Sequence, residues 1–190
     1  LFMSSIRNSL ILATGVAVVG TIFISLLSYI IVRTKLRGRG ALDFMSWLPW
    51  SVPGILLALG LLWVFLGGVI SLKFLYGTLW IIGFALIIGD LPIGVRLLSG
   101  TMIQLGNELE ESARNLGASW TYTFRGIVVP LILPSMATLA FISFLSAMTC
   151  ISTVVLLYSA KSRVLSILML EHYIGLSPEN QKKYQANFLD

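Results

Sequence analysis

Residues 111–130, ESARNLGASWTYTFRGIVVP, decide the fold, because they lie in the only long polar segment between apolar runs of membrane length. Before Gly117, apolar side chains recur at steps of four, four and three residues, which is typical of one helix face. After it, the steps are four, three and four, which predicts a second short helix. The two sets are Leu105, Leu109, Ala113 and Leu116, and then Trp120, Phe124, Ile127 and Leu131.

Gly117 separates the two patterns. Glycine adopts a positive φ at little energetic cost, so we expect the chain to turn a corner there. Pro130 and Pro134 follow where a new apolar run begins. The sequence therefore predicts a helix, a turn and a helix outside the bilayer, with an apolar face that the membrane does not need.

The composition indicates an integral membrane protein. Hydrophobic residues make up 57% of the 190 residues and charged residues 11%, whereas a soluble domain carries roughly a quarter charged residues. The net charge is +5, but the cations do not form a stripe for nucleic acid. Four of them crowd one loop at residues 33–40, RTKLRGRG, which the positive-inside rule places in the cytoplasm.

The first apolar run, residues 10–32, contains no charge and is long enough to span a bilayer. A signal peptide is the alternative, but its apolar region would be shorter and a cleavage site would follow. Because the next loop is cytoplasmic, residue 1 is expected outside. The chain begins with Leu1 rather than Met, which leaves open that residues precede it.

We predict a transmembrane domain over residues 1–175, with four spans at about 8–32, 46–70, 74–97 and 128–150. Pro49 and Pro53 should break the second span, because proline removes a helix hydrogen bond. The polar tail, residues 176–190, is of doubtful origin, and we leave it out of the fold prediction.

Polar groups within the spans are few. Asp90 is the one acid, and its alternatives are a functional carboxylate or a group near the surface that reaches water or Arg96. The hydroxyls after Ser143 either bind neighbouring backbone or line a polar path. Cys150 is read as a small packed hydrophobe and His172 as a surface residue. A single cysteine and a single histidine provide neither a disulfide within the chain nor a metal site.

The polar segment also carries a resemblance to a known family. Glu111-Ser112-Ala113, followed at fixed gaps by Gly117 and by residues 127–130, IVVP, resembles the EAA motif of type I ABC importer permeases. Ser112 and Val129 depart from the motif, which has alanine and leucine there, and both are small changes. The block at residues 48–60, LPWSVPGILLALG, is similar to the second core span of the ferric-iron importers.

This resemblance implies an all-α, polytopic membrane helix bundle with about four spans and a cytoplasmic coupling helix, at about residues 104–126. In that family the coupling helix docks on a separate ATP-binding subunit. We expect Leu109, Ala113 and Leu116 to be exposed beside polar neighbours that include Glu110. The predicted docking residues are Leu109, Glu111, Ser112, Ala113, Leu116, Gly117 and Trp120.

The resemblance further implies a transport subunit rather than an enzyme. No phosphate-binding loop of the Walker type and no zinc-protease or hydrolase motif occurs in the sequence. We expect no cofactor in this chain, because ATP and magnesium would be bound by the partner. The expected partners are the ATP-binding subunit, an identical or homologous permease half, a periplasmic solute-binding protein and the lipid bilayer, with no nucleic acid.

The expected location is the bacterial inner membrane. The expected solute is ferric iron, with polyamine, thiamine, phosphonate and molybdate as alternatives. This chain would resemble the second half of a permease that carries two homologous halves. A secondary transporter or channel subunit remains a rival, although it would need more ionisable groups in the spans than Asp90 alone. The other rival is a membrane anchor without a transport path.

Overall fold

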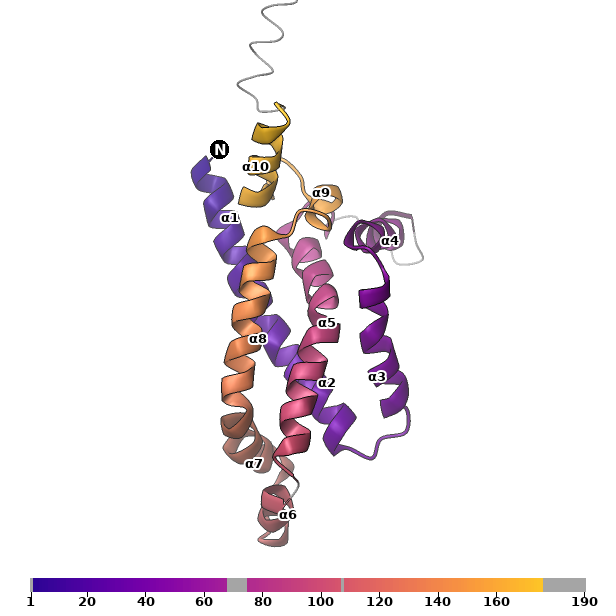
Figure 1. Ribbon diagram of the computed structural model, residues 1–190, viewed down its shortest axis with the longest axis vertical. Coiled ribbons are helices and arrows are strands. Elements are labelled where there is room, and N and C mark those ends of the chain that lie inside the picture. Colours follow the sequence, from indigo (N-terminus) through magenta and orange to yellow (C-terminus); the bar gives the residue numbers. More distant parts are fainter. Residues whose placement is uncertain (1, 68–74, 107, 176–190) are drawn as a thin grey trace, which may run out of the picture. The chain divides into compact units, whose positions relative to one another are not determined.

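The computed structural model describes residues 2–67, 75–106 and 108–175, and Figure 1 traces the order of their helices. The described residues contain helices and no strand. The predicted tail, residues 176–190, and parts of the second and third predicted spans lie outside the described residues. The elements are α1 (Phe2–Gly15), η1 (Val16–Gly20), α2 (Thr21–Arg33), α3 (Arg39–Trp47), η2 (Leu48–Ser51), α4 (Gly54–Gly67), α5 (Leu79–Gln104), α6 (Glu108–Asn115), α7 (Trp120–Thr123), η4 (Phe124–Val128), α8 (Val129–Thr149), α9 (Val154–Leu157) and α10 (Leu165–Tyr173).

Three stretches of helix are long and apolar enough to cross a membrane: Phe2–Arg33, Leu79–Gln104 and Trp120–Thr149. A fourth is present if the broken pair Arg39–Ser51 and Gly54–Gly67 is one span. The break falls at the predicted prolines, since Pro49 lies in the 3-10 turn η2 and Pro53 directly precedes α4. The all-helical fold class that the family resemblance implies is therefore confirmed.

Two long helices extend further than the hydropathy pattern indicates. Residues 98–104 lie beyond the predicted third span, at about 74–97, but belong to α5, which runs unbroken past Pro92 to Gln104. The second short helix expected after Gly117 is instead the first part of one continuous helix that includes α8. A widened π-turn, η4, lies just before Pro130. It shifts the hydrogen-bond register where proline cannot donate, so the helix continues.

The described residues divide into two compact units, which we describe separately. The first comprises, of the described residues, 2–15, 53–67, 75–86 and 145–175. In it, α1 presents a polar face to the loop before α10. The Asn8 side-chain amide donates to the backbone carbonyls of Lys161 and Arg163, at 3.1 and 3.0 Å. Ser9 Oγ accepts from the Leu165 N–H at 2.7 Å and so satisfies a free donor at the start of α10.

The second unit comprises residues 16–52 and 87–144 and contains the predicted coupling segment. Its apolar core is formed by α2, α5 and α8, which approach closely at Gly94. A Cβ added there would lie 2.9 Å from an Ile24 methyl carbon and 3.0 Å from one of Leu139. A second cluster, nearer the coupling segment, packs Tyr29, Met102, Val128 and Ile132. These contacts fix the ends of the three helices from which the candidate site is built.

Candidate functional site

The helix α6 is a separate rod between two glycine corners. Gly106 has φ +66° before it and Gly117 has φ +83° after it, both in the left-handed region. The stripe predicted from Leu105 to Leu116 is therefore not one continuous helix, because the chain turns at Gly106. Three glutamates lie in the first turn of α6 and Arg114 in its last, so these charges complement the helix dipole.

The corner after α6 is a Schellman turn followed by an N-cap. The Ala118 N–H donates to the Ala113 carbonyl at 3.0 Å, and the Gly117 N–H donates to the Arg114 carbonyl at 2.9 Å. Two residues after Gly117, Ser119 Oγ accepts from the Tyr122 N–H at 3.3 Å and begins α7. The corner predicted at Gly117 is thus confirmed.

The outward face of this corner carries large apolar side chains among polar ones. Leu109 is 54% exposed, Leu116 is 89% exposed and Trp120 is 52% exposed. Glu111 and Ser112 are exposed as well. The structure therefore brings most of the predicted docking residues to one accessible helix-turn-helix segment. Single exposed apolar residues are common, but three at one corner suit a surface for a partner.

The inward face of α6 differs from the expectation. Ala113, predicted to be exposed, is buried, and so is Glu110, predicted to be a polar neighbour in solvent. The physical reason is the turn at Gly106, which rotates α6 so that these two side chains face the second unit. The acidic run at residues 108–111 is therefore divided, with Glu110 turned inward and Glu108 and Glu111 in solvent.

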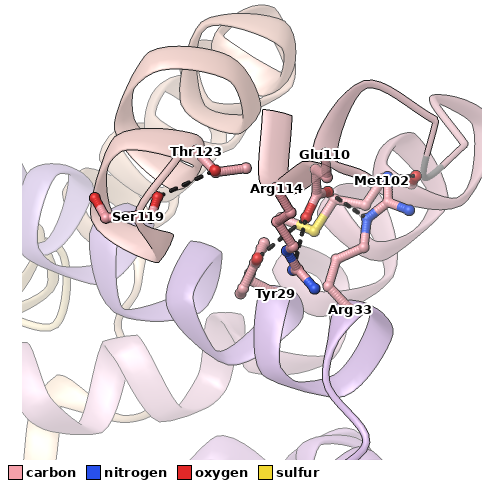
Figure 2. Close-up of polar contacts among 7 residues, drawn as sticks. All are labelled: Tyr29, Arg33, Met102, Glu110, Arg114, Ser119 and Thr123. Carbon is pink, nitrogen blue, oxygen red and sulfur yellow. Dashed lines mark hydrogen bonds and ion pairs between the residues drawn. The ribbon is translucent and has the colours of Figure 1, made fainter. Parts of the chain in front are cut away.

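Glu110 is the centre of a buried ion cluster (Figure 2). Arg33 Nε lies 3.0 Å from Glu110 Oε1, with both side chains less than a tenth exposed, although the N–H is not aligned for a hydrogen bond. Tyr29 donates its hydroxyl hydrogen to Glu110 Oε2 at 3.1 Å, and Arg114 Nη2 lies 3.6 Å from the same oxygen. Removing one partner from a buried pair of this kind costs about 3–5 kcal/mol, because a charge is left uncompensated.

The cluster joins three helices of the second unit. Arg33 lies at the C-terminal end of α2 and also donates from Nη2 to the Met102 carbonyl of α5, at 2.7 Å. Glu110 itself is on α6. A guanidinium can bind a carboxylate and a carbonyl together because its donors are held in a planar fork. The site is therefore held by charge and hydrogen bonding where the apolar core ends.

The aromatic side chains of α7 and η4 meet the same tyrosine. The Tyr29 ring packs edge-on against Trp120 and Phe124, with centroid distances of 5.9 and 5.0 Å. Trp120 and Phe124 are themselves stacked at 5.4 Å. Edge-to-face and stacked pairs are favourable aromatic geometries. Trp120 thus packs on Tyr29 with one part of its side chain, while about half of its surface remains exposed.

Sequence reasoning missed the cluster of Glu110, Arg33 and Tyr29. From the sequence, Arg33 is one of the loop cations that indicate topology, and Glu110 is one of the polar neighbours of the docking residues. The sequence does contain one indication of the cluster. Arg33 is the first cation after an apolar run, and Tyr29 lies one helical turn before it, so both side chains fall on one face at the end of the same helix. Among the described residues, no three His, Cys, Asp or Glu side chains come together as a metal site.

Comparison with known proteins identifies the family. The sequence model for "binding-protein-dependent transport system inner membrane component" matches residues 20–176, most of the chain. The chain belongs to this family. The resemblance noted from the EAA-like residues is therefore confirmed at the family level.

Two curated relatives of this family are ferric transport permeases. The putative ferric transport system permease protein FbpB 1 of Haemophilus influenzae is 34% identical over 86% of this chain and 25% of its own length. The ferric transport system permease protein FbpB of Actinobacillus pleuropneumoniae is 32% identical over 87% of this chain and 24% of its own. The chain thus spans about a quarter of the length of these relatives. Permeases named for molybdate/tungstate and for sulfate transport are also similar.

A solved structure shares the fold. It is a bacterial ABC transporter involved in the import of the acidic polysaccharide alginate, with a TM-score of 0.69 and 21% identity. The match covers 100% of this chain and 64% of the other. Similarity at this identity concerns the fold, which is that of a transmembrane chain of an ABC importer.

Proposed function

We propose that this chain is part of the permease of an ATP-driven importer in the bacterial inner membrane. The observation that carries the proposal is the accessible corner formed by α6 and α7, which exposes Leu109 and Leu116 outside the long apolar helices and Trp120 at the first residue of one of them. A membrane helix bundle needs no such surface for its own stability. A subunit that receives mechanical work from a soluble motor does need one.

The proposed docking residues on this corner are Leu109, Glu111, Ser112, Leu116 and Trp120, with Gly117 setting the angle between the two arms. Ala113 has a different role from the other predicted residues. Because Ala113 is buried on the inner face of α6, we propose that its small side chain permits close packing of the helix and does not touch the partner.

The proposed mechanism follows from this docking surface. Two permease halves form the pathway at their interface, and a periplasmic binding protein delivers the solute at the outer face. ATP binding closes two ATP-binding subunits, which draws the two coupling helices together and opens the pathway outward. Hydrolysis then resets the pair, so the chemistry of ATP lies in the partner chain.

Cysteine crosslinking tests the docking surface. In the whole protein, with Cys150 replaced by alanine, Ser112→Cys and Leu116→Cys should crosslink to the proposed ATP-binding subunit. Ala113→Cys, on the same helix but buried, is the matched control and should react far less. Failure of both exposed cysteines to crosslink, with the two proteins present in one membrane, would refute the docking surface.

Ferric iron is the proposed solute, supported by the two ferric relatives. The molybdate/tungstate and sulfate relatives give the specific competing candidates. Uptake of radioactive ferric iron, molybdate and sulfate by cells with and without the gene separates them. We expect only ferric uptake to depend on the gene, and dependence of molybdate or sulfate uptake instead would overturn this assignment.

A further inference from the structure

Two glycine corners set α6 off from the helices on either side of it. Gly106 and Gly117 both have positive φ, and a Cβ added to either would meet no atom within 4 Å. The helix has only eight residues, of which Glu110 and Ala113 are buried. The corner at Gly117 is closed by two backbone hydrogen bonds and leads into α7, so it links α6 to the long helix that includes α8. Motion of α6 reaches α2 by a different route, through side-chain contacts.

Those contacts converge on Glu110. Its carboxylate faces Arg33 and Tyr29, both on the last two turns of α2. Arg33 in turn holds the last turn of α5 through the Met102 carbonyl. The charges are shielded from water, so the carboxylate cannot slide away from the guanidinium without leaving a buried charge unpaired. Such a contact transmits displacement, because its geometry cannot change without the loss of a buried charge pair.

The second arm of the corner reaches the same residue of α2. Trp120 and Phe124 pack on the Tyr29 ring, while the Tyr29 hydroxyl binds Glu110. Both arms thus press on one side chain near the C-terminal end of α2, as Figure 2 shows for the α6 arm.

We propose that Glu110 is the positioning residue that ties α6 to α2, so that movement of the docked corner is passed to α2 through Arg33 and Tyr29. This inference rests on the proposed function, because it assumes that α6 is moved by a partner. It assigns the transmission to Glu110, which lies on the inner side of α6, whereas Leu109 and Leu116 are exposed on its outer side. Trp120 takes part in both surfaces, because it is half exposed and also packs on Tyr29.

Hydrogen–deuterium exchange tests the tie without any partner. In the whole protein, Glu110→Gln should make the α6 amides exchange about a hundredfold faster or more, because the substitution leaves the buried Arg33 charge without its carboxylate partner. Glu108→Gln, the exposed neighbour in the same turn, is the matched control and should leave exchange unchanged. If Glu110→Gln does not insert, Tyr29→Phe removes one bond of the cluster and should give a smaller acceleration in the same segment. Unchanged exchange of α6 in a folded variant would overturn the inference.

A coupling assay in proteoliposomes separates this inference from the proposed function. The whole permease, its ATP-binding subunit and its binding protein are reconstituted, with ferric iron and molybdate as parallel probes. We expect Glu110→Gln to retain the ATP-binding subunit and ATP hydrolysis but to lose solute transport. Normal transport, or loss of subunit binding together with transport, would refute transmission through Glu110. If the unmodified permease does not bind the ATP-binding subunit, the proposed function itself fails.

Discussion

At the scale of single residues, the corner depends on the left-handed backbone of Gly117. The residue has φ +83°, and its N–H closes the turn after α6 by donating to the Arg114 carbonyl. An L side chain at positive φ costs roughly 1–2 kcal/mol, because Cβ crowds the following carbonyl. Gly117 is exposed and has free space around it. The requirement for glycine there is therefore one of backbone conformation, not of packing.

Replacing Gly117 with valine should uncouple ATP hydrolysis from uptake, because the strained corner changes the angle between α6 and α7. The protein should still insert, since the substitution leaves the apolar core intact. Gly126→Ala is the control, because Gly126 is helical and an added Cβ meets only ordinary contacts at 3.9 Å. The ratio of solute transported to ATP hydrolysed is the measurement. Equal ratios for the Gly117 variant and the unmodified protein would count against the corner argument.

The same corner shows what sequence could predict at this scale. The turn at Gly117 and the start of a new apolar run at Pro130 could be predicted from the sequence, because the backbone preferences of glycine and proline are local. Glu110 was not distinguishable from Glu108 and Glu111, because all three are glutamates in one helical turn. Its burial depends on a partner from a distant part of the chain, Arg33, and on the rotation imposed by Gly106. No local pattern reports that pairing.

At the scale of elements, helix existence was predictable and helix length was not. The charge-free runs indicate which segments can lie in the hydrocarbon core of the bilayer. They do not indicate where a helix ends, because a helix can continue beyond the bilayer as long as its backbone hydrogen bonds are satisfied. For this reason α5 continues through residues 99–104, and α7 joins α8 despite Pro130. Among the described prolines, only Pro49 and Pro53 lie at a break in the helices, where Val52 takes an extended conformation.

The crossing of α2, α5 and α8 at Gly94 gives a stability prediction. Gly94→Val should destabilise the protein by about 1–3 kcal/mol, because the added atoms overlap Ile24 and Leu139. Gly89→Val, five residues earlier on α5 with open space around it, carries the same change in helix propensity and is the control. Unfolding of both variants in detergent measures the difference. Equal stability of the two variants would contradict the close approach described for Gly94.

The loop between α9 and α10 gives a pH prediction. Burial raises the pKa of Tyr158, and the hydrogen bond to Glu171 and the negative charge of Glu171 raise it further, against an opposing effect of Arg163. The folded state therefore prefers neutral tyrosine. Its stabilising contribution is complete below the unfolded pKa of about 10 and is lost as pH rises through the higher folded pKa.

Tyr158→Phe should remove that part of the alkaline loss of stability, and Glu171→Gln should reduce it. Unfolding in detergent across the alkaline range measures the effect, with the unmodified protein as the reference. A Tyr158→Phe variant that loses stability as steeply as the unmodified protein would show that this contact carries none of the dependence.

At the scale of the whole molecule, the exposed apolar surface matches a chain that is surrounded by lipid and further protein. Trp63 and Trp80 are both more than three-quarters exposed. Soluble domains rarely expose large apolar surface to this extent. The chain spans about a quarter of its ferric relatives. The sequence predicted the family through the spacing from Glu111 to Pro130, whereas the solute depends on chemistry that this spacing does not encode.

The most direct test of the central claim is labelling of Leu116→Cys by a membrane-impermeant maleimide, in the whole protein with Cys150 replaced by alanine. We predict labelling in inside-out vesicles but not in intact cells, and protection from labelling once the ATP-binding subunit is bound. Labelling from the outer side, or equal labelling with and without the bound subunit, would contradict the claim that the α6–α7 corner is the docking surface for the ATP-binding subunit.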